Sequence, residues 1–247
     1  MNRADFKVEI CANGVESCLS AQKAGADRVE LCNSIPEGGT TPSYAEIRQA
    51  RQLLKDTRLH VIIRPRGGDF IYSALEAERM MMDIDIAHEL GADGVVFGCL
   101  TPEGNVDIPL CRQLMQQAKG MSVTFHRAFD CCQDPRKSLE DIISLGCNRI
   151  LTSGQASTAE LGIGLLKELQ VQANGRIILL AGCGVNEQNI AKICKETGIS
   201  EFHFSAREPV LSTESCQNSL RTDEFDRRFL TTERRVKTTI DALIAGI

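Results

Sequence analysis

Residues 25–32 read Gly25-Ala26-Asp27-Arg28-Val29-Glu30-Leu31-Cys32 and follow a helical pattern of apolar residues. A glycine just after a helical pattern is typical of a helix C-terminus, and the apolar run that follows this glycine in the sequence predicts a buried strand. Other helical patterns also end in a glycine that is soon followed by an apolar run, at Gly91, Gly146, Gly175 and Gly198. The sequence therefore predicts that helices and strands alternate along the chain.

Eight strand-like runs recur in the chain, with helical patterns between and after them. The runs are Phe6–Cys11, Arg28–Cys32, Leu59–Arg64, Gly94–Gly98, Ser122–His126, Arg149–Thr152, Arg176–Ala181 and Glu201–Ser205. The helical patterns are Gly14–Ala24, Ser43–Leu54, Ser73–Leu90, Ile108–Ala118, Pro135–Leu145, Ser157–Val171, Asn186–Lys195 and Thr231–Ala245.

Strict β–α alternation implies parallel pairing through right-handed crossovers, and eight repeats favour closure of the sheet. We predict an α/β fold, a single TIM barrel, (β/α)₈, with eight parallel strands in one domain over residues 1–247. A doubly wound open sheet is the alternative. The one irregular stretch is Arg207–Leu230, between the last strand and the last helix. It would lie on the catalytic side of a barrel, as a lid, an interface segment or plain disorder.

The 247 residues are 43% hydrophobic and 25% charged, as in ordinary globular domains. A net charge of −5 argues against a general nucleic-acid-binding protein, which usually presents a basic field. No stretch approaches the roughly 20 apolar residues that span a bilayer, and residues 1–5 lack the pattern of a signal peptide. We therefore expect a cytoplasmic protein with neither nucleic-acid nor membrane partners.

Eleven cysteines are many for such a protein, and we interpret them as reduced thiols, because the count is odd and several lie inside apolar runs. The sequence has no CxxC or CxC pair, so a zinc ribbon is not indicated. Cys11 and Cys32 occupy equivalent positions on the first two strands, which lie about 4.8 Å apart if they are neighbours. Their thiolates would favour Cu(I), although free cysteine is also a common core residue.

Barrel enzymes gather their active sites at the carboxyl ends of the strands. Side chains alternate along a strand, so Glu9 and Glu30 would point into the barrel near its mouth. His126 and His203 end strands as well, and Asp130 follows closely. These five residues are candidate acids, bases or ligands of a divalent metal. The alternative is a closed network of ion pairs that fills the barrel.

An anion site is indicated at the same rim by Arg64, Arg66 and Arg127, because guanidinium groups bind phosphate or carboxylate bidentately. The turn Gly182-Cys183-Gly184 precedes a predicted helix near Asn186, and its N–H groups could hold a phosphate, with Ser205 on the next strand. The alternative for this turn is that its tight geometry simply requires glycine.

Several motifs together resemble the CutC copper homeostasis family, over about residues 8–206. They are Val8-Glu9-Ile10-Cys11, the stretch at 25–32, Glu37-Gly38-Gly39-Thr40-Thr41-Pro42-Ser43, Ile63-Arg64-Pro65-Arg66-Gly67-Gly68-Asp69-Phe70, Thr124-Phe125-His126-Arg127-Ala128-Phe129-Asp130, Leu151-Thr152-Ser153-Gly154 and Glu201-Phe202-His203. The resemblance implies a TIM barrel, a cytoplasmic location and a role in copper tolerance. It also implies Cu(I) binding through cysteines, for which the matching positions are Cys11 and Cys32.

Three hypotheses follow from these residues. The first is a copper homeostasis protein that binds Cu(I) through its two strand-end cysteines. The second is an enzyme that acts on a small anionic or phosphorylated substrate by acid–base or metal-assisted chemistry. The third is a scaffold that associates with itself, and we expect a homodimer or higher homo-oligomer in any case.

Overall fold

A computed structural model describes residues 3–211 and 227–247. Eight parallel strands close into a barrel in chain order, each hydrogen-bonded to the next and β8 to β1. The strands are β1 (Lys7–Ala12), β2 (Arg28–Leu31), β3 (Arg58–Ile62), β4 (Gly94–Phe97), β5 (Ser122–Phe125), β6 (Arg149–Thr152), β7 (Ile178–Ala181) and β8 (Glu201–Phe204). The predicted barrel is confirmed, and the open sheet is excluded.

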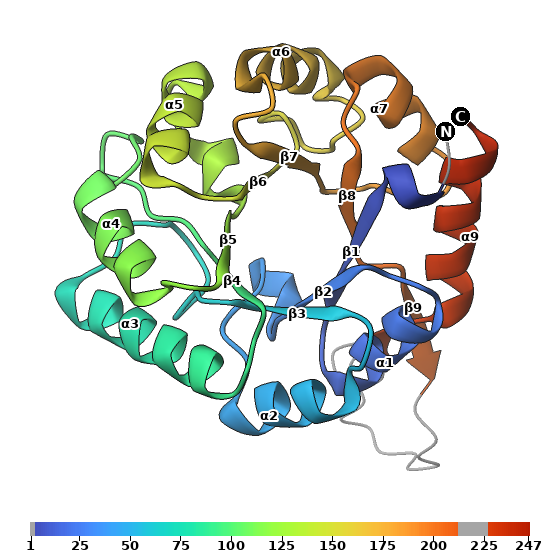
Figure 1. Cartoon of the computed structure of the whole chain (residues 1–247), viewed down its shortest axis with the longest axis horizontal. Helices are drawn as coiled ribbons and strands as arrows, with labels where there is room; N and C mark the ends of the chain where they lie inside the picture. The colour runs from blue at the N-terminus through green and yellow to red at the C-terminus, as the bar shows by residue number, and fades with distance from the viewer. Residues whose placement is uncertain (1–2, 212–226) are drawn as a thin grey trace, which may run out of the picture.

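The helices form a ring around the barrel (Figure 1). They are α1 (Val15–Lys23), α2 (Tyr44–Leu53), α3 (Ala74–Glu89), α4 (Ile108–Gln117), α5 (Pro135–Leu145), α6 (Ile163–Ala173), α7 (Ile190–Thr197) and α9 (Glu233–Ala245). Three short 3-10 helices are η1 (Arg3–Asp5), η2 (Ile35–Glu37) and η3 (Arg127–Cys131). Ser43 and Ser73 begin α2 and α3 with capping boxes, which satisfy N–H groups that the first helical turn leaves free.

The two faces of the sheet differ in chemistry, as the alternation of side chains predicts. Outward residues such as Val8, Ile10, Val29 and Leu31 are fully buried in the hydrophobic layer between strands and helices. Inward residues include charged side chains that are also buried, Glu9 among them. The apolar core therefore lies outside the barrel, and its interior is free to carry a polar site.

Two glycines of the β4 region make room for inward histidines. A side chain at Gly94 would place its Cβ 2.5 Å from Nε2 of His60. One at Gly98 would come within 2.6 Å of Nδ1 of His126. Small and large residues thus alternate across neighbouring strands, which lets the imidazoles fit inside a barrel of fixed diameter.

Some predicted boundaries were wrong. Helix α6 begins at Ile163 and not at Ser157, because the preceding loop bonds to the turn after β7, with the Ala159 N–H donating to the Cys183 carbonyl. Helix α7 begins at Ile190 and not near Asn186, because the Asn189 side chain accepts the Asn186 N–H in a turn of its own.

The stretch predicted to be irregular, 207–230, has ordered ends. Strands β9 (Arg207–Leu211) and β10 (Arg227–Thr231) pair antiparallel next to the barrel, and residues 212–226 lie outside the described part. The carbonyl of Phe229 accepts a hydrogen bond from the Asn13 side chain, and the Thr231 N–H donates to the hydroxyl of Ser17. These contacts fasten the two-stranded sheet to the loop and helix that follow β1.

Within the described residues, no helix is both long enough and apolar enough to cross a membrane. The ten cysteines found there are all free.

Candidate functional site

A cavity of about 520 Å³ opens where the carboxyl ends of the strands meet, and we call it the mouth cavity. It is lined by Cys11, Glu30, Cys32, Ile35, Gly38, Gly39, Ile62, Arg64, Phe70, His126, Arg127, Cys131, Leu151, Cys183, Gly184, Val185, His203, Phe204, Ser205 and Arg207. Most of the residues singled out from the sequence are therefore brought together here. Glu9, Arg66, Asp130 and Gly182 do not line it.

Two thiols meet at one wall of the cavity. The Sγ atoms of Cys11 and Cys32 lie 3.5 Å apart, and a carboxylate oxygen of Glu30 lies within 4.8 Å of both. The contact with Cys32, together with burial, raises the pKa of Cys11 well above its usual value. Cys11 is thus protonated at neutral pH, and a soft metal ion would have to displace its proton to bind there.

Glu30 is buried beside Cys11 and Cys32, and one of its two carboxylate oxygens is not hydrogen-bonded within the described part of the chain. Its Oε1 has no hydrogen-bond partner among the described residues. Burial raises the pKa of Glu30 to about 7, although the charge of His203 works in the opposite direction. A carboxyl group with such a pKa can give or take a proton at physiological pH.

His203 lies between two carboxylates. Its Nδ1 is 2.7 Å from Oε1 of Glu9, and its Nε2 is 3.6 Å from Oε2 of Glu30. Burial alone would lower the pKa of His203, but hydrogen bonds with Cys11 and Glu9 and the charge of Glu30 raise it well above its usual value. The imidazole is therefore cationic, and it links the cavity to the barrel interior.

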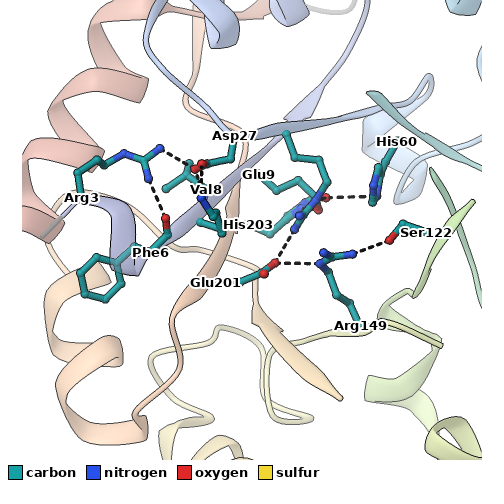
Figure 2. Close-up of polar contacts among 12 residues, drawn as sticks. Arg3, Phe6, Val8, Glu9, Asp27, His60, Ser122, Arg149, Glu201 and His203 are labelled. Atoms are coloured by element: carbon teal, nitrogen blue, oxygen red, sulfur yellow. Dashed lines mark hydrogen bonds and ion pairs between the residues drawn. The ribbon is translucent and has the colours of Figure 1, made fainter. Parts of the chain in front are cut away.

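Below the cavity, buried ion pairs fill the barrel (Figure 2). Glu9 pairs with Arg28, Arg28 reaches Glu201 at 2.8 Å, and Glu201 also holds Arg149 at 2.9 Å. Arg149 donates in turn to the hydroxyl of Ser122. Burial would raise the pKa of Glu9, but Arg28 and His203 outweigh it and hold this pKa below its usual range.

The two arginines after β3 differ in their surroundings. Arg64 donates to the backbone carbonyls of Glu37, Gly39 and Gly68 at 2.8–2.9 Å, and its buried Nε has no partner among the described residues. Arg66 forms ion pairs with Glu76 and Asp69 away from the mouth cavity. Arg64 therefore clamps two loops of the rim, whereas Arg66 is neutralised outside it.

On the opposite wall, Arg127 pairs with Asp130 at 2.8 Å. The Asp130 carboxylate also accepts hydrogen bonds from the Thr152 hydroxyl and from the N–H groups of Ser153 and Gln155. With its oxygens engaged in this way, Asp130 joins η3 to the loop after β6 and orients Arg127. It does not face the cavity.

His126 is buried at the same rim. Its Nδ1 accepts the N–H of Ala128, and its Nε2 has no partner among the described residues. Burial lowers the pKa of His126 to about 3, helped by the charge of Arg64. The ring is neutral and is held at 4.9 Å from the Phe70 ring, so its free nitrogen is available to a bound molecule.

The family model described as the CutC family matches residues 6–208. The chain belongs to the CutC family. It is 63% identical to a CutC family protein of Bacteroides thetaiotaomicron over 245 residues, which cover 96% of this chain and 98% of the relative. A second relative, from Bacteroides fragilis strain YCH46, is 59% identical over 98% of this chain and 99% of its own length.

Among solved structures, a CutC protein from Streptococcus agalactiae, whose name refers to copper homeostasis, superposes with a TM-score of 0.78. It is 38% identical and covers 81% of this chain and 98% of its own. The CutC fold is thus shared at both the sequence and the structural level. The reference to copper homeostasis is part of the name of the Streptococcus agalactiae protein.

Sequence reasoning missed inward residues in the first part of the strands. Arg28, His60 and Glu201 are buried inside this CutC-family barrel, and the partly buried Arg149 joins them among the charged contacts below the cavity. The signal was present, because each lies an even number of residues before an inward residue near its strand's end, as Arg28 does before Glu30. The rule that barrel enzymes gather functional residues at the carboxyl ends of strands does not point to them.

Proposed function

We propose that this protein is an enzyme that binds a small anionic molecule in the mouth cavity and transfers a proton to or from it. The observation that carries the proposal is that buried polar atoms without partners, Glu30 Oε1 and His126 Nε2, belong to side chains that line one cavity. Buried polar atoms are normally hydrogen-bonded, and exceptions in a cavity are typical of groups that await a ligand.

The charges support an anionic ligand. Arg127 and Arg207 line the cavity together, and the Nε of Arg207 has no hydrogen-bond partner among the described residues. Guanidinium groups recognise carboxylates and phosphates by paired hydrogen bonds. Glu30 would act as the acid or base, because its pKa of about 7 lies near the operating pH. His203, held by Glu9, would fix the position of Glu30.

Calorimetric titration with succinate and with inorganic phosphate tests the binding step. We expect at least one of these anions to bind the wild type, and its Kd to rise at least about tenfold in the Arg127→Gln/Arg207→Gln double variant. Arg66→Gln is the matched control, since Arg66 is ion-paired outside the mouth cavity. Failure of both anions to bind, or equal weakening by Arg66→Gln, would contradict the proposal.

A second candidate function is Cu(I) binding in copper homeostasis. A specific observation favours it, the 3.5 Å separation of the Cys11 and Cys32 sulfurs beside Glu30. Thiolates are soft ligands that prefer Cu(I), so the chemistry of this pair fits the ion as a bound cargo. The name of the Streptococcus agalactiae relative points the same way.

Anaerobic Cu(I) titration tests this second function. The wild type should bind one ion tightly, and the Cys11→Ser/Cys32→Ser variant should lose that binding. The matched control is Cys131→Ser/Cys183→Ser, which removes two other thiols from the same cavity. If tight Cu(I) binding survives in the Cys11→Ser/Cys32→Ser variant, this pair does not hold the ion.

We also infer a cytoplasmic location, which the free state of the ten described cysteines supports.

A further inference from the structure

The turn after β7 carries backbone N–H groups that no other described group uses. Cys183 and Gly184 both have left-handed backbone angles, φ 76° and 71°. The N–H groups of Cys183, Gly184 and Val185 make no hydrogen bond within the described residues, although all three residues line the mouth cavity. A left-handed angle in a residue with a side chain costs free energy, and such strain is typical of functional sites.

Complementary groups surround this turn. Ser205, at the end of β8, lines the same cavity, and its hydroxyl makes no hydrogen bond within the described residues. Arg127 uses its Nε for Asp130, and its Nη2 makes only a long contact of 3.4 Å with Ser153. Arg207 follows Ser205 closely on β9. Free N–H groups, a hydroxyl and two guanidinium groups form the kind of concavity that holds a phosphate.

The rest of the cavity restricts where an anion can sit. Arg64 already donates three hydrogen bonds to backbone carbonyls through Nη1 and Nη2, which hold its guanidinium group between two loops of the rim. The wall formed by Cys11, Glu30 and Cys32 presents a carboxyl group, and His203, the cation beside it, already lies between the carboxyl groups of Glu9 and Glu30. A doubly charged group is thus favoured at the turn after β7 and disfavoured at Glu30. Barrel enzymes often bind phosphate at the loops after strands 7 and 8.

We propose that the substrate is a small phosphomonoester whose phosphate group binds the N–H groups of Gly184 and Val185, the Ser205 hydroxyl and the guanidinium groups of Arg127 and Arg207. The remainder of the molecule extends toward Glu30. The cavity, about 520 Å³, falls in the range of small-molecule pockets, so it holds more than the phosphate alone. This inference rests on the proposed enzymatic function and gives its substrate a class and an orientation.

Amide chemical shifts of the ¹⁵N-labelled full chain test this directly, without a variant. Inorganic phosphate and glycerol 2-phosphate are the probes, and succinate is the comparison. We expect both phosphates to shift the Gly184 and Val185 amides, with glycerol 2-phosphate at least about fivefold tighter, because its tail fills part of the cavity. Absence of these shifts at saturating phosphate, or binding of inorganic phosphate but not of the ester, would overturn the inference.

Two variants sharpen the test. Ser205→Ala removes the hydroxyl with little change of shape, and Val185→Pro removes one N–H group. Each should weaken glycerol 2-phosphate about tenfold, which corresponds to about 1.4 kcal/mol, while succinate changes less than twofold. If succinate binds but the phosphates do not, the phosphomonoester is wrong and the anion-binding enzyme stands. If none of the three binds, both proposals fail.

Discussion

Nδ1 of His203 lies 2.7 Å from Oε1 of Glu9 inside the barrel, and this pair joins the cavity to the ion pairs beneath it. Glu9 is fully buried and also contacts Arg28, so a single carboxylate compensates two cations. A buried charge without its partner is costly, and the position of the imidazole next to Glu30 depends on this contact. The site is therefore built on a network whose parts are not independent.

Loss of the Glu9 charge should destabilise the fold strongly. Glu9→Gln keeps the shape but leaves Arg28 and His203 partly uncompensated in the interior. We expect the free energy of unfolding, measured by urea denaturation, to fall by about 3–5 kcal/mol. Asp69→Asn, which breaks an exposed ion pair with Arg66, should cost far less, because solvent screens that pair. Equal costs for the two variants would contradict the role given to Glu9.

The stability of the protein should depend on the titration of Glu30. Its pKa is about 7 in the folded protein and near 4.5 in the unfolded chain, so the folded state holds this proton more tightly. The corresponding stabilisation is complete below pH about 4.5 and is lost as the pH rises through about 7.

Glu30→Gln, which mimics the protonated acid, should lack this dependence. The wild type should lose up to about 3 kcal/mol relative to the variant between pH 4 and pH 8, from about 1.36 kcal/mol for each pKa unit. Denaturation series at several pH values measure the difference. A difference that stays constant across this range would show that the pKa of Glu30 is not raised.

Two glycine substitutions should act with opposite signs. Gly98→Ala places a Cβ 2.6 Å from the His126 ring and should cost about 1–3 kcal/mol through overpacking. Gly164→Ala lies in helix α6 with open space around the added carbon, and it should stabilise by up to about 1 kcal/mol. Thermal denaturation distinguishes them, and a neutral Gly98→Ala would contradict the close packing at His126.

The paired thiols should react slowly in the absence of metal. Cys131 is exposed, whereas Cys32 is buried and Cys11 has a pKa far above neutral. At pH 7, iodoacetamide should modify Cys131 at least about tenfold faster than Cys11 or Cys32, because only an accessible thiolate reacts, and burial shields Cys32 from the reagent. Mass spectrometry of peptides gives the rates, and the preference should vanish in denaturant. Fast alkylation of Cys11 in the folded protein would contradict the raised pKa of this thiol.

The sequence predicts the barrel well because each strand follows its own local signals. The predicted strand Arg149–Thr152 has the same bounds as β6, and the predicted helix Pro135–Leu145 has the same bounds as α5. Boundaries failed where tertiary hydrogen bonds override local propensity, as at the loop before α6, which bonds to the turn after β7. No local pattern records a bond between two loops that are distant in the chain.

The candidate site was predictable in its members but not in their partners. Alternation correctly places Glu30, Cys11 and Cys32 at one end of the barrel. It does not show that Arg66 turns away to Glu76 or that Asp130 is occupied by backbone N–H groups, since both depend on how loops fold back. The ion pairs at Glu201 join β8 to β2 and β6, each two strands away around the closed barrel, so no local pattern records them.

The central claim, that Glu30 transfers a proton to or from an anionic molecule in the mouth cavity, is tested most directly by deuterium exchange. Small phosphorylated and carboxylated carbonyl compounds are incubated with the protein in D₂O, and proton NMR follows exchange at the carbon beside the carbonyl. The account predicts exchange of at least one compound by the wild type and a loss of about 100-fold or more in Glu30→Gln. Exchange that persists unchanged in Glu30→Gln, or no exchange of any compound by the wild type, would contradict it.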